Sequence, residues 1–243
     1  DRVPSGQVTG GSRSVQIAGS SVGDAADKLI ELAREAAADL LEAAPGDIVL
    51  DRERGAFHVA GSPTAARSWA EIAGDAGEPL VGLSDFAQAG ATFPFGTHIA
   101  VAEVDTETGH ATVERIIAVD DAGVIINPLL AAGQIHGGLA QGIAQALLEE
   151  FRYDEDGNPQ TSNLADYTAI SMMEVPMYER SFTETSTPRN PLGAKGIGEA
   201  GSIGSTPAVQ SAVIDALAPF GIRHLDMPLT PERIWSALQS SVA

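Results

Sequence analysis

A glycine-rich stretch, residues 190–203, constrains this chain more than any other segment. It reads NPLGAKGIGEAGSI, in which five residues are glycine or proline and only Lys195 and Glu199 are charged. Glycines leave the backbone bare where another group must approach closely. An apolar helix is predicted over residues 203–217, with Pro207 in its first turn, and the free N–H groups before such a helix favour an anionic, phosphate-bearing ligand. Because a glutamate repels phosphate, Glu199 indicates chemistry beside the anion rather than anion binding alone.

The composition narrows the classes of function. The chain has 243 residues, 44% of them hydrophobic, which is enough for one large domain or two small ones. Its formal net charge of −19 argues against nucleic acid or an anionic membrane surface as partner. The sequence contains no cysteine, which excludes disulfides and cysteine-ligated iron–sulfur clusters within it and is compatible with a cytoplasmic location. No apolar run approaches the roughly 20 residues of a membrane helix, so no membrane insertion is expected.

The glycine- and serine-rich residues 1–21 leave two interpretations open. Such a composition is typical of a disordered tail. Alternatively, residues 10–14, GGSRS, supply backbone N–H groups, hydroxyls and a guanidinium as an anion cradle. A long helix is predicted directly afterwards, over residues 22–44, from its helical apolar period, with Ser20 or Ser21 as its cap and Pro45 as its stop.

Turn residues and periodicity predict the shorter elements. A capping-box pattern, Ser68 to Glu71, starts a short helix. Two alternating segments around the turn TETGH form a hairpin, and Thr230 and Pro231 begin a C-terminal helix with Ile234, Trp235 and Leu238 facing inward. The expected strands are residues 48–50, 56–59, 97–105, 111–120 and 177–185.

A second glycine-rich segment is predicted to be a helix over residues 133–151. It contains four glycines, each of which weakens a helix by about 1 kcal/mol relative to alanine. Such a sequence suits a core helix packed tightly against another backbone. It equally suits a helix whose bare surface meets a ligand, with Gln134 as donor near the helix N-terminus. Both interpretations stay open at this point.

Three blocks together resemble one family, the molybdenum hydroxylases, which comprise xanthine dehydrogenase, aldehyde oxidase and aerobic carbon monoxide dehydrogenase. The blocks are TGGSRS at 9–14, GQIHGGLAQGIAQALLEE at 133–150 and GAKGIGEAGSIGSTPAVQSAVIDAL at 193–217. FPFGTHIAVAEVD at 93–105 and GVIINP at 123–128 extend the likeness over nearly the whole chain. The resemblance is to the C-terminal part of the large, molybdopterin-binding subunit.

The resemblance implies a function and a set of site residues. The family holds molybdenum in a molybdopterin, usually the cytosine dinucleotide form in bacteria. It oxidises a C–H bond or an aldehyde with oxygen from water, and passes electrons to iron–sulfur and flavin partners. Glu199 matches the general base beside the metal, and a dry glycine loop would suit that work. No residue of the chain is expected to ligate the metal itself. The implied cofactor-binding residues are Gly11, Ser12, Arg13, Ser14, Gln134, Lys195, Gly196 and Gly198.

The expected fold is α+β, with mixed, mainly antiparallel sheets packed against helices, as in the cofactor-binding domain of that family. Two lobes are predicted, one over residues 1–85 and one over 86–243. The family's large subunit is about three times longer, so a partner chain is expected to supply the rest of the site. Two alternatives remain, a cofactor-binding module without catalysis and a structural subunit whose glycines serve only helix packing.

Overall fold

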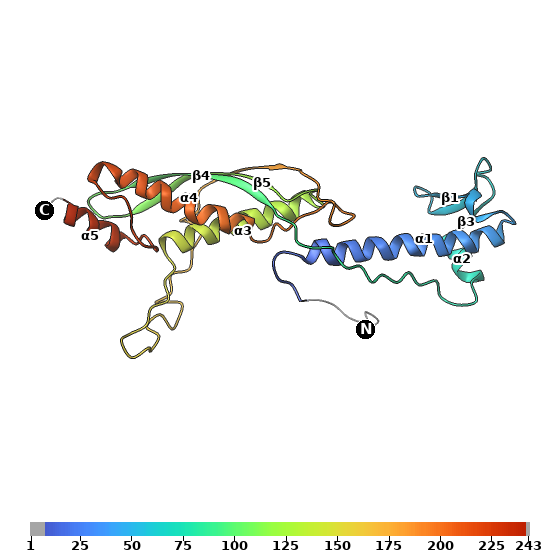
Figure 1. The fold of residues 1–243 in the computed structure, drawn as a ribbon, viewed down its shortest axis with the longest axis horizontal. Coiled ribbons are helices and arrows are strands. Elements are labelled where there is room, and N and C mark those ends of the chain that lie inside the picture. The colour runs from blue at the N-terminus through green and yellow to red at the C-terminus, as the bar shows by residue number, and fades with distance from the viewer. Residues whose placement is uncertain (1–7, 242–243) are drawn as a thin grey trace. The chain divides into compact units, whose positions relative to one another are not determined.

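The computed structural model describes residues 8–241, so residues 1–7 of the predicted tail lie outside the described part. The described chain forms two compact units, one of residues 15–89 and one that combines residues 8–14 with residues 90–241 (Figure 1). The division into two domains at 1–85 and 86–243, which the sequence suggests, stays a prediction. In the structure, the GGSRS segment groups with the larger unit, which also contains Glu199.

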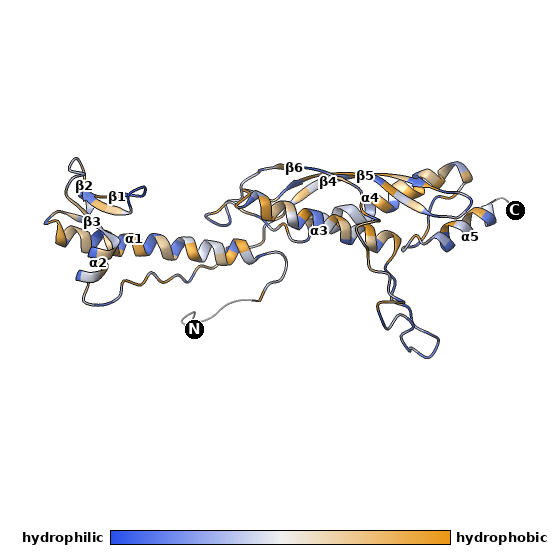
Figure 2. Cartoon of the chain, turned by 180° about the vertical axis from the view of Figure 1, so that it is seen from behind, coloured by the Kyte–Doolittle hydropathy of each residue, from blue (hydrophilic) through white to orange (hydrophobic). Residues whose placement is uncertain are grey.

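The smaller unit packs a long helix against a three-stranded sheet. Helix α1 (Ser20–Leu40) follows a π-helical turn, Val15–Gly19, and hydrophobic and hydrophilic bands alternate along it (Figure 2). Strands β1 (Ile48–Asp51), β2 (Ala56–Val59) and β3 (Ala66–Ser68) pair antiparallel in that order. Helix α2 (Trp69–Asp75) begins at the predicted capping box, in which Ser68 and Glu71 bond reciprocally. The core of this unit contains Ala33, Ala37, Ile48, Phe57 and Ile72.

Two predictions for α1 are wrong at its ends. The residue before the helix, Gly19, already has helical dihedral angles, and no side chain caps the helix. The π-helical turn supplies the preceding backbone, so neither Ser20 nor Ser21 acts as a cap. The helix ends at Leu40, before the predicted stop at Pro45. Residues 15–21, which the disordered interpretation included, are therefore helical.

The larger unit is a three-stranded sheet with helices on one face (Figure 1). Strands β4 (Phe95–Val104) and β5 (Ala111–Asp121) form the predicted antiparallel hairpin, and β6 (Tyr178–Thr183) pairs parallel with β5. Helices α3 (Pro128–Leu147) and α4 (Ala200–Leu217) cover the inner face. The predicted α+β fold class is confirmed. The core of the larger unit contains Ile116, Ala118, Ile135, Leu139, Ile143, Val209, Val213, Leu217 and Ile234.

Both helices begin earlier than predicted. Helix α3 starts at Pro128 because Asn127 accepts hydrogen bonds from the N–H groups of Leu129 and Leu130, a cap that the glycine pattern did not reveal. Helix α4 starts at Ala200, so Pro207 lies inside the helix and not in its first turn. The glycine-rich loop is therefore shorter than the sequence suggested, and Glu199 lies at the helix N-cap.

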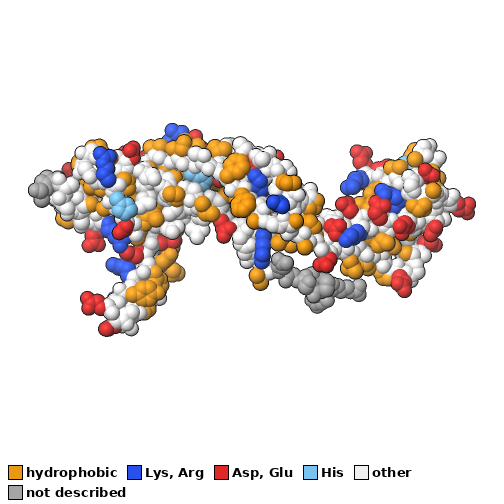
Figure 3. Space-filling model, in the orientation of Figure 1, with side chains coloured by type: hydrophobic (Ala, Val, Ile, Leu, Met, Phe, Trp, Pro, Cys, Tyr) orange, Lys and Arg blue, Asp and Glu red, His pale blue; other side chains and the backbone are white. Residues whose placement is uncertain are grey.

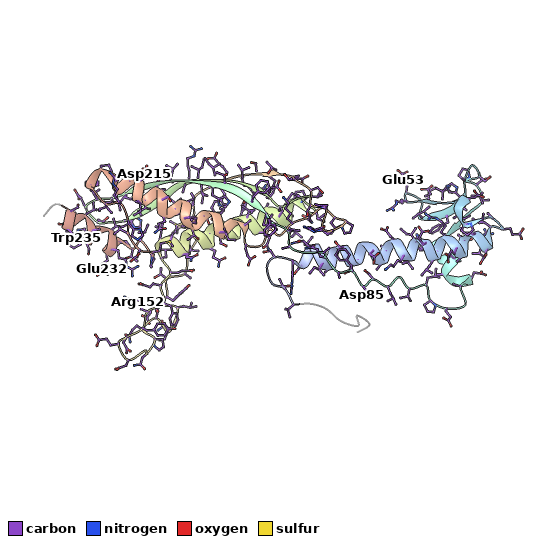
Figure 4. All side chains as sticks on the ribbon, in the orientation of Figure 1. Glu53, Asp85, Arg152, Asp215, Glu232 and Trp235 are labelled. Carbon is purple, nitrogen blue, oxygen red and sulfur yellow. The ribbon has the colours of Figure 1, made fainter. Side chains whose placement is uncertain are left out.

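Helix α5 (Pro231–Ser241) is the last element of the larger unit. Ile234 and Leu238 are buried as predicted, whereas Trp235 is 45% exposed, which corrects the prediction that it faces inward. Figure 4 labels Glu232 and Trp235 on this helix. Between α3 and β6 the chain forms an extended segment with apolar side chains on its surface (Figure 3), including Leu164, Met172, Met173 and Met177. No helix within residues 8–241 is both long and apolar enough to cross a bilayer.

Candidate functional site

The site is centred on a hydrogen bond between two segments far apart in the sequence. The Ser12 hydroxyl donates to Oε2 of Glu199 over 2.8 Å. The backbone is unusual on the Ser12 side of this contact. Gly11 and Ser12 have φ angles of 58° and 54°, in the left-handed region, and Glu199 is the N-cap residue of α4. The structure thus brings together the N-terminal cradle and the glutamate loop.

Gly198 allows this close approach. A Cβ atom built on Gly198 would lie 3.0 Å from Ser12 Oγ and 3.7 Å from Gln134 Oε1. The first distance is tighter than ordinary van der Waals contact, so a side chain here would push against the serine. The structure therefore has four residues as neighbours that the resemblance assigns to one site: Ser12, Gln134, Gly198 and Glu199.

The packing of α3 on α4 fixes the position of Glu199. A Cβ on Gly138 would lie 2.8 Å from the Cα of Gly201, and a Cβ on Gly142 would clash with the Ser205 side chain. Two glycines of α3 therefore serve helix packing, as one interpretation proposed. Because α4 starts one residue after Glu199, the packing of α3 on α4 also fixes the position of the Glu199 backbone.

The other two glycines of α3 have a different environment. Within the described chain, nothing lies within 4 Å of a Cβ built on Gly133 or Gly137. The same holds for Gly10 and Gly11 in the N-terminal cradle. The surface beside Gln134, which is itself exposed, is therefore bare and open. Packing and an open ligand-facing surface thus both occur on α3, at different glycines.

The cradle carries polar groups beyond Ser12. The hydroxyls of Thr9 and Ser14 lie 2.8 Å apart, and the Arg13 guanidinium donates to the backbone oxygen of Val8 over 3.4 Å. Arg13 Nε is buried and has no hydrogen-bond partner in residues 8–241. Such an unsatisfied donor is rare in proteins and suits an anionic partner.

Lys195, which the resemblance implies as a cofactor-binding residue, forms a buried ion pair within this chain. Its ammonium donates to Oδ1 of Asp121 over 2.8 Å, with 8% of the lysine side chain and none of the aspartate side chain exposed. It also lies 4.7 Å from the centroid of the Phe95 ring. The loop does not present Lys195 beside Glu199 as a second charge; the side chain joins the loop to the end of β5. Gly196, next along the chain, is buried.

Asp121 is strongly bound at this anchor. Burial raises the pKa of Asp121, but hydrogen bonds from Lys195, Gly123 and Thr185 outweigh burial and hold the pKa far below its ordinary value. Thr183 donates a further bond to Oδ2 over 3.1 Å. The carboxylate is therefore ionised at neutral pH, and it ties the glutamate loop to the sheet.

Asn190 stiffens the loop from the inside. Its side-chain amide donates to the Ala194 carbonyl over 2.8 Å and accepts from the Ala194 N–H over 3.2 Å. This pair of bonds closes a turn in which Gly193 has a left-handed φ of 65°. Neither Asn190 nor Asp121 was predicted from the sequence as part of the site. An Asn-Pro pair at a loop start and two successive aspartates at a strand end are the only signals that pointed to them.

The structure corrects one expectation about Glu199. The side chain is exposed within this chain, so the loop does not provide the dry environment predicted for it. Glu199 nevertheless lies in contact with the cradle, as the two-segment site requires. Among residues 8–241, no group of three or more histidine, aspartate or glutamate side chains is placed to hold a metal ion.

Comparisons with known proteins find one family model and several related chains. Residues 1–176 match the family model of the molybdopterin cofactor-binding domain. The chain is 39% identical to the carbon monoxide dehydrogenase large chain of Hydrogenophaga pseudoflava, over 97% of this chain and 30% of that one. Its fold matches reconstituted CO dehydrogenase from Oligotropha carboxidovorans with a TM-score of 0.90 and 34% identity, covering 99% of this chain and 31% of the other.

A third relative is named for a different substrate. Quinoline 2-oxidoreductase from Pseudomonas putida 86 matches with a TM-score of 0.85 and 37% identity, over 95% of this chain and 30% of that one. The chain thus spans less than a third of the length of these relatives. Glu199 lies beyond the residues that match the family model, although the longer comparisons extend over nearly the whole chain.

Proposed function

The chain belongs to the family of molybdopterin cofactor-binding domains, and we propose from this membership that it is the catalytic part of a molybdenum hydroxylase large subunit. It spans 30% of the length of the relatives, so the remaining cofactor contacts and the substrate pocket are assigned to a partner chain that carries the N-terminal part of the molybdenum subunit. The substrate class that we propose is a C–H bond or an aldehyde, oxidised with oxygen from water; carbon monoxide, which has no C–H bond, is tested beside it because one relative is named for it.

The residues present fit the cofactor. Molybdopterin carries phosphate, and its dinucleotide form carries a pyrophosphate, both of which need N–H donors, hydroxyls and cationic charge close to bare backbone. The cradle offers backbone N–H groups at Gly11 and Ser12, the Ser14 hydroxyl and the Arg13 guanidinium, whose buried Nε has no hydrogen-bond partner in residues 8–241 and is free to bind an anion. The open surface at Gly133 and Gly137 leaves room beside the Gln134 amide. We propose the cytosine dinucleotide as the form bound.

Gln134 and the start of α4 complete the binding surface that we propose. The Gln134 amide can donate and accept, and it lies against Gly198, next to the glutamate. No side chain caps α4, so the positive end of its dipole faces the site. Gly196 and Gly198 keep the loop narrow. Lys195 anchors the start of the loop to the sheet through its bond to Asp121.

When bound, the cofactor supplies the redox centre for a two-electron oxidation. Glu199 is proposed as the general base at that centre. Its carboxylate has one oxygen held by Ser12, whereas Oε1 has no hydrogen-bond partner among residues 8–241. An exposed, unpaired carboxylate oxygen at the centre of the binding surface can take up a proton. Exclusion of water from Glu199 is assigned to that partner chain, because this chain leaves the side chain exposed.

The partners follow from what the chain lacks. With no cysteine, it holds no cysteine-ligated iron–sulfur cluster. The family resemblance implies that electrons leave through iron–sulfur and flavin partner chains. The net charge of −19 gives no surface for nucleic acid, and we propose no membrane insertion. The proposed complex is a cytoplasmic heteromer.

A single observation supports this proposal most strongly: Glu199 and the cradle residue Ser12 are in contact although 187 positions separate them. The test is Glu199→Gln in the native complex that contains this chain, with carbon monoxide, quinoline or acetaldehyde as substrate and an acceptor dye. Loss of a general base is worth roughly a hundredfold to ten-thousandfold in turnover. Turnover equal to that of the wild type, with molybdenum still bound, would instead favour a cofactor-binding module without catalysis.

A further inference from the structure

The contact between Ser12 and Glu199 has a more specific consequence for the site. We propose that Ser12 is a positioning residue for Glu199, which fixes one carboxylate oxygen so that the other faces the reacting group, and that its hydroxyl is not a ligand of the cofactor. This inference rests on the proposed function of Glu199. It differs from the resemblance, which implies a role for Ser12 in binding the pterin or the nucleotide phosphates.

The geometry of the hydrogen bond carries the first step. Ser12 Oγ lies 2.8 Å from Oε2 of Glu199, whereas Oε1 has no partner in the described chain. A carboxylate on a flexible side chain can otherwise rotate and present either oxygen. A single donor on Oε2 removes that freedom and leaves Oε1 as the oxygen for proton transfer.

The backbone of Ser12 carries the second step. A non-glycine residue with a φ of 54° is in a region that costs energy for an L-residue. Gly11 just before it has a φ of 58°, so two successive residues turn the chain sharply. A glycine at position 12 would adopt this left-handed conformation without strain. What a serine adds at this position is therefore its side-chain hydroxyl. Strain held in place at a proposed catalytic contact is typical of functional sites.

Gly198 carries the third step. A Cβ there would lie 3.0 Å from the serine hydroxyl and 3.6 Å from the Ser12 Cβ. The residue before the glutamate therefore has no side chain at the point where the serine reaches across. Three features, the left-handed turn, the bare glycine and the hydrogen bond, converge on the same carboxylate.

A cysteine pair tests the geometry without any cofactor. Cβ atoms joined by a disulfide lie about 3.5–4.5 Å apart, a range that includes the 3.6 Å between positions 12 and 198. The chain has no cysteine of its own, so Ser12→Cys/Gly198→Cys should lose both free thiols on mild oxidation. Two thiols that stay free in the folded protein would contradict the contact and with it the inference.

Ser12→Gly in the native complex tests the role. The variant removes the hydroxyl and relieves the backbone, so the melting temperature should stay unchanged or rise. We expect the turnover of carbon monoxide, quinoline or acetaldehyde to fall at least about tenfold with KM nearly unchanged, and the molybdenum content to stay at the wild-type level. A fall in molybdenum content would assign Ser12 to cofactor binding and overturn the inference.

A double-variant cycle separates this inference from the proposed function. If Ser12 acts through Glu199, adding Ser12→Gly to Glu199→Gln should cost no further turnover. A large loss in Glu199→Gln with none in Ser12→Gly would overturn only the positioning role. No loss in Glu199→Gln, or a wild-type complex that oxidises none of the three substrates, would overturn the proposed function itself.

Ser202→Ala is the matched control. The Ser202 hydroxyl also bonds Glu199, but through the backbone oxygen, over 3.1 Å. Its removal takes one hydroxyl from the same helix terminus without touching the carboxylate. Turnover should stay at the wild-type level, and a loss as large as that of Ser12→Gly would indicate a general effect of the helix end and contradict the assignment to Ser12.

Discussion

Lys195 and Asp121 form a buried ion pair that ties the loop of Glu199 to the end of strand β5. The ammonium nitrogen and Oδ1 are 2.8 Å apart, and neither side chain is more than 8% exposed. The backbone reinforces the connection, because the Lys195 N–H donates to the Ala122 carbonyl over 2.7 Å. The position of the proposed base therefore depends on a contact between a loop and a strand that lie far apart in the sequence.

Breaking this pair from one side should be costly. Lys195→Met leaves the Asp121 carboxylate buried without its cation, and such a change destabilises proteins by about 3–5 kcal/mol. Urea unfolding of the chain measures this directly. Arg115→Ala is the control, because Arg115 and Glu179 form a pair that is more than half exposed and worth about 1 kcal/mol or less. Equal losses in the two variants would show that the buried pair is no anchor.

The same carboxylate predicts a pH dependence of stability. The pKa of Asp121 is far below its ordinary value of 3.8, because the bonds from Lys195, Gly123 and Thr185 outweigh burial. A group whose pKa is lower in the folded than in the unfolded protein stabilises the fold fully at pH values above its pKa in the unfolded protein. That stabilisation is lost as the pH falls toward its pKa in the folded protein. The contribution of Asp121 should therefore be constant above about pH 5 and decline below about pH 4.

Asp121→Asn isolates that contribution from the other acidic groups. Between the two pKa values, stability falls by about 1.4 kcal/mol per pH unit for one group. The difference in unfolding free energy between wild type and Asp121→Asn should thus shrink as the pH is lowered from 4 to 3. Urea titrations at pH 6, 4 and 3 measure it, and a difference that grows on acidification would have the wrong sign for this assignment.

Elements with local signals were predictable from the sequence. The Ser68 capping box, the hairpin of β4 and β5 and the Thr230–Pro231 helix start each depend on residues a few positions apart, and the structure has all three. Contacts between distant segments were not predictable in this way. The parallel pairing of β6 with β5 and the Lys195–Asp121 bond have no local signature.

The site shows the same division. Resemblance placed Ser12, Gln134, Gly198 and Glu199 together, and the structure has them as neighbours. The sequence could not tell that Lys195, four residues before Glu199, turns toward the sheet, because its partner lies in another strand. Nor could it distinguish the packing glycines of α3 from the open ones, since only the position of α4 decides which face is covered.

That distinction between the glycines of α3 makes a prediction about stability. Gly138→Ala places a Cβ 2.8 Å from the Gly201 Cα, where backbone must move, and overpacking of this kind costs about 1–3 kcal/mol. Gly137→Ala adds the same methyl group to open space and should stabilise the helix by up to about 1 kcal/mol. Thermal unfolding of the two variants should therefore shift in opposite directions, and a common shift would contradict the observed helix crossing.

The open glycines also predict where the cofactor lies. Within the described chain, nothing contacts a side chain at Gly137, so Gly137→Leu should fold with a melting temperature close to that of the wild type. If this bare surface receives the molybdopterin, the added side chain fills the space that the cofactor needs. Elemental analysis of the native complex should then find molybdenum reduced at least about tenfold.

Glu35→Leu provides the comparison for a bulky apolar residue added elsewhere on the surface. Glu35 is an exposed residue of helix α1 in the smaller unit, outside the segments proposed to bind the cofactor. The molybdenum content of this variant should match that of the wild type. Gly137→Leu with full molybdenum would place the cofactor away from α3, because a leucine side chain and a bound pterin cannot occupy the same space beside Gln134.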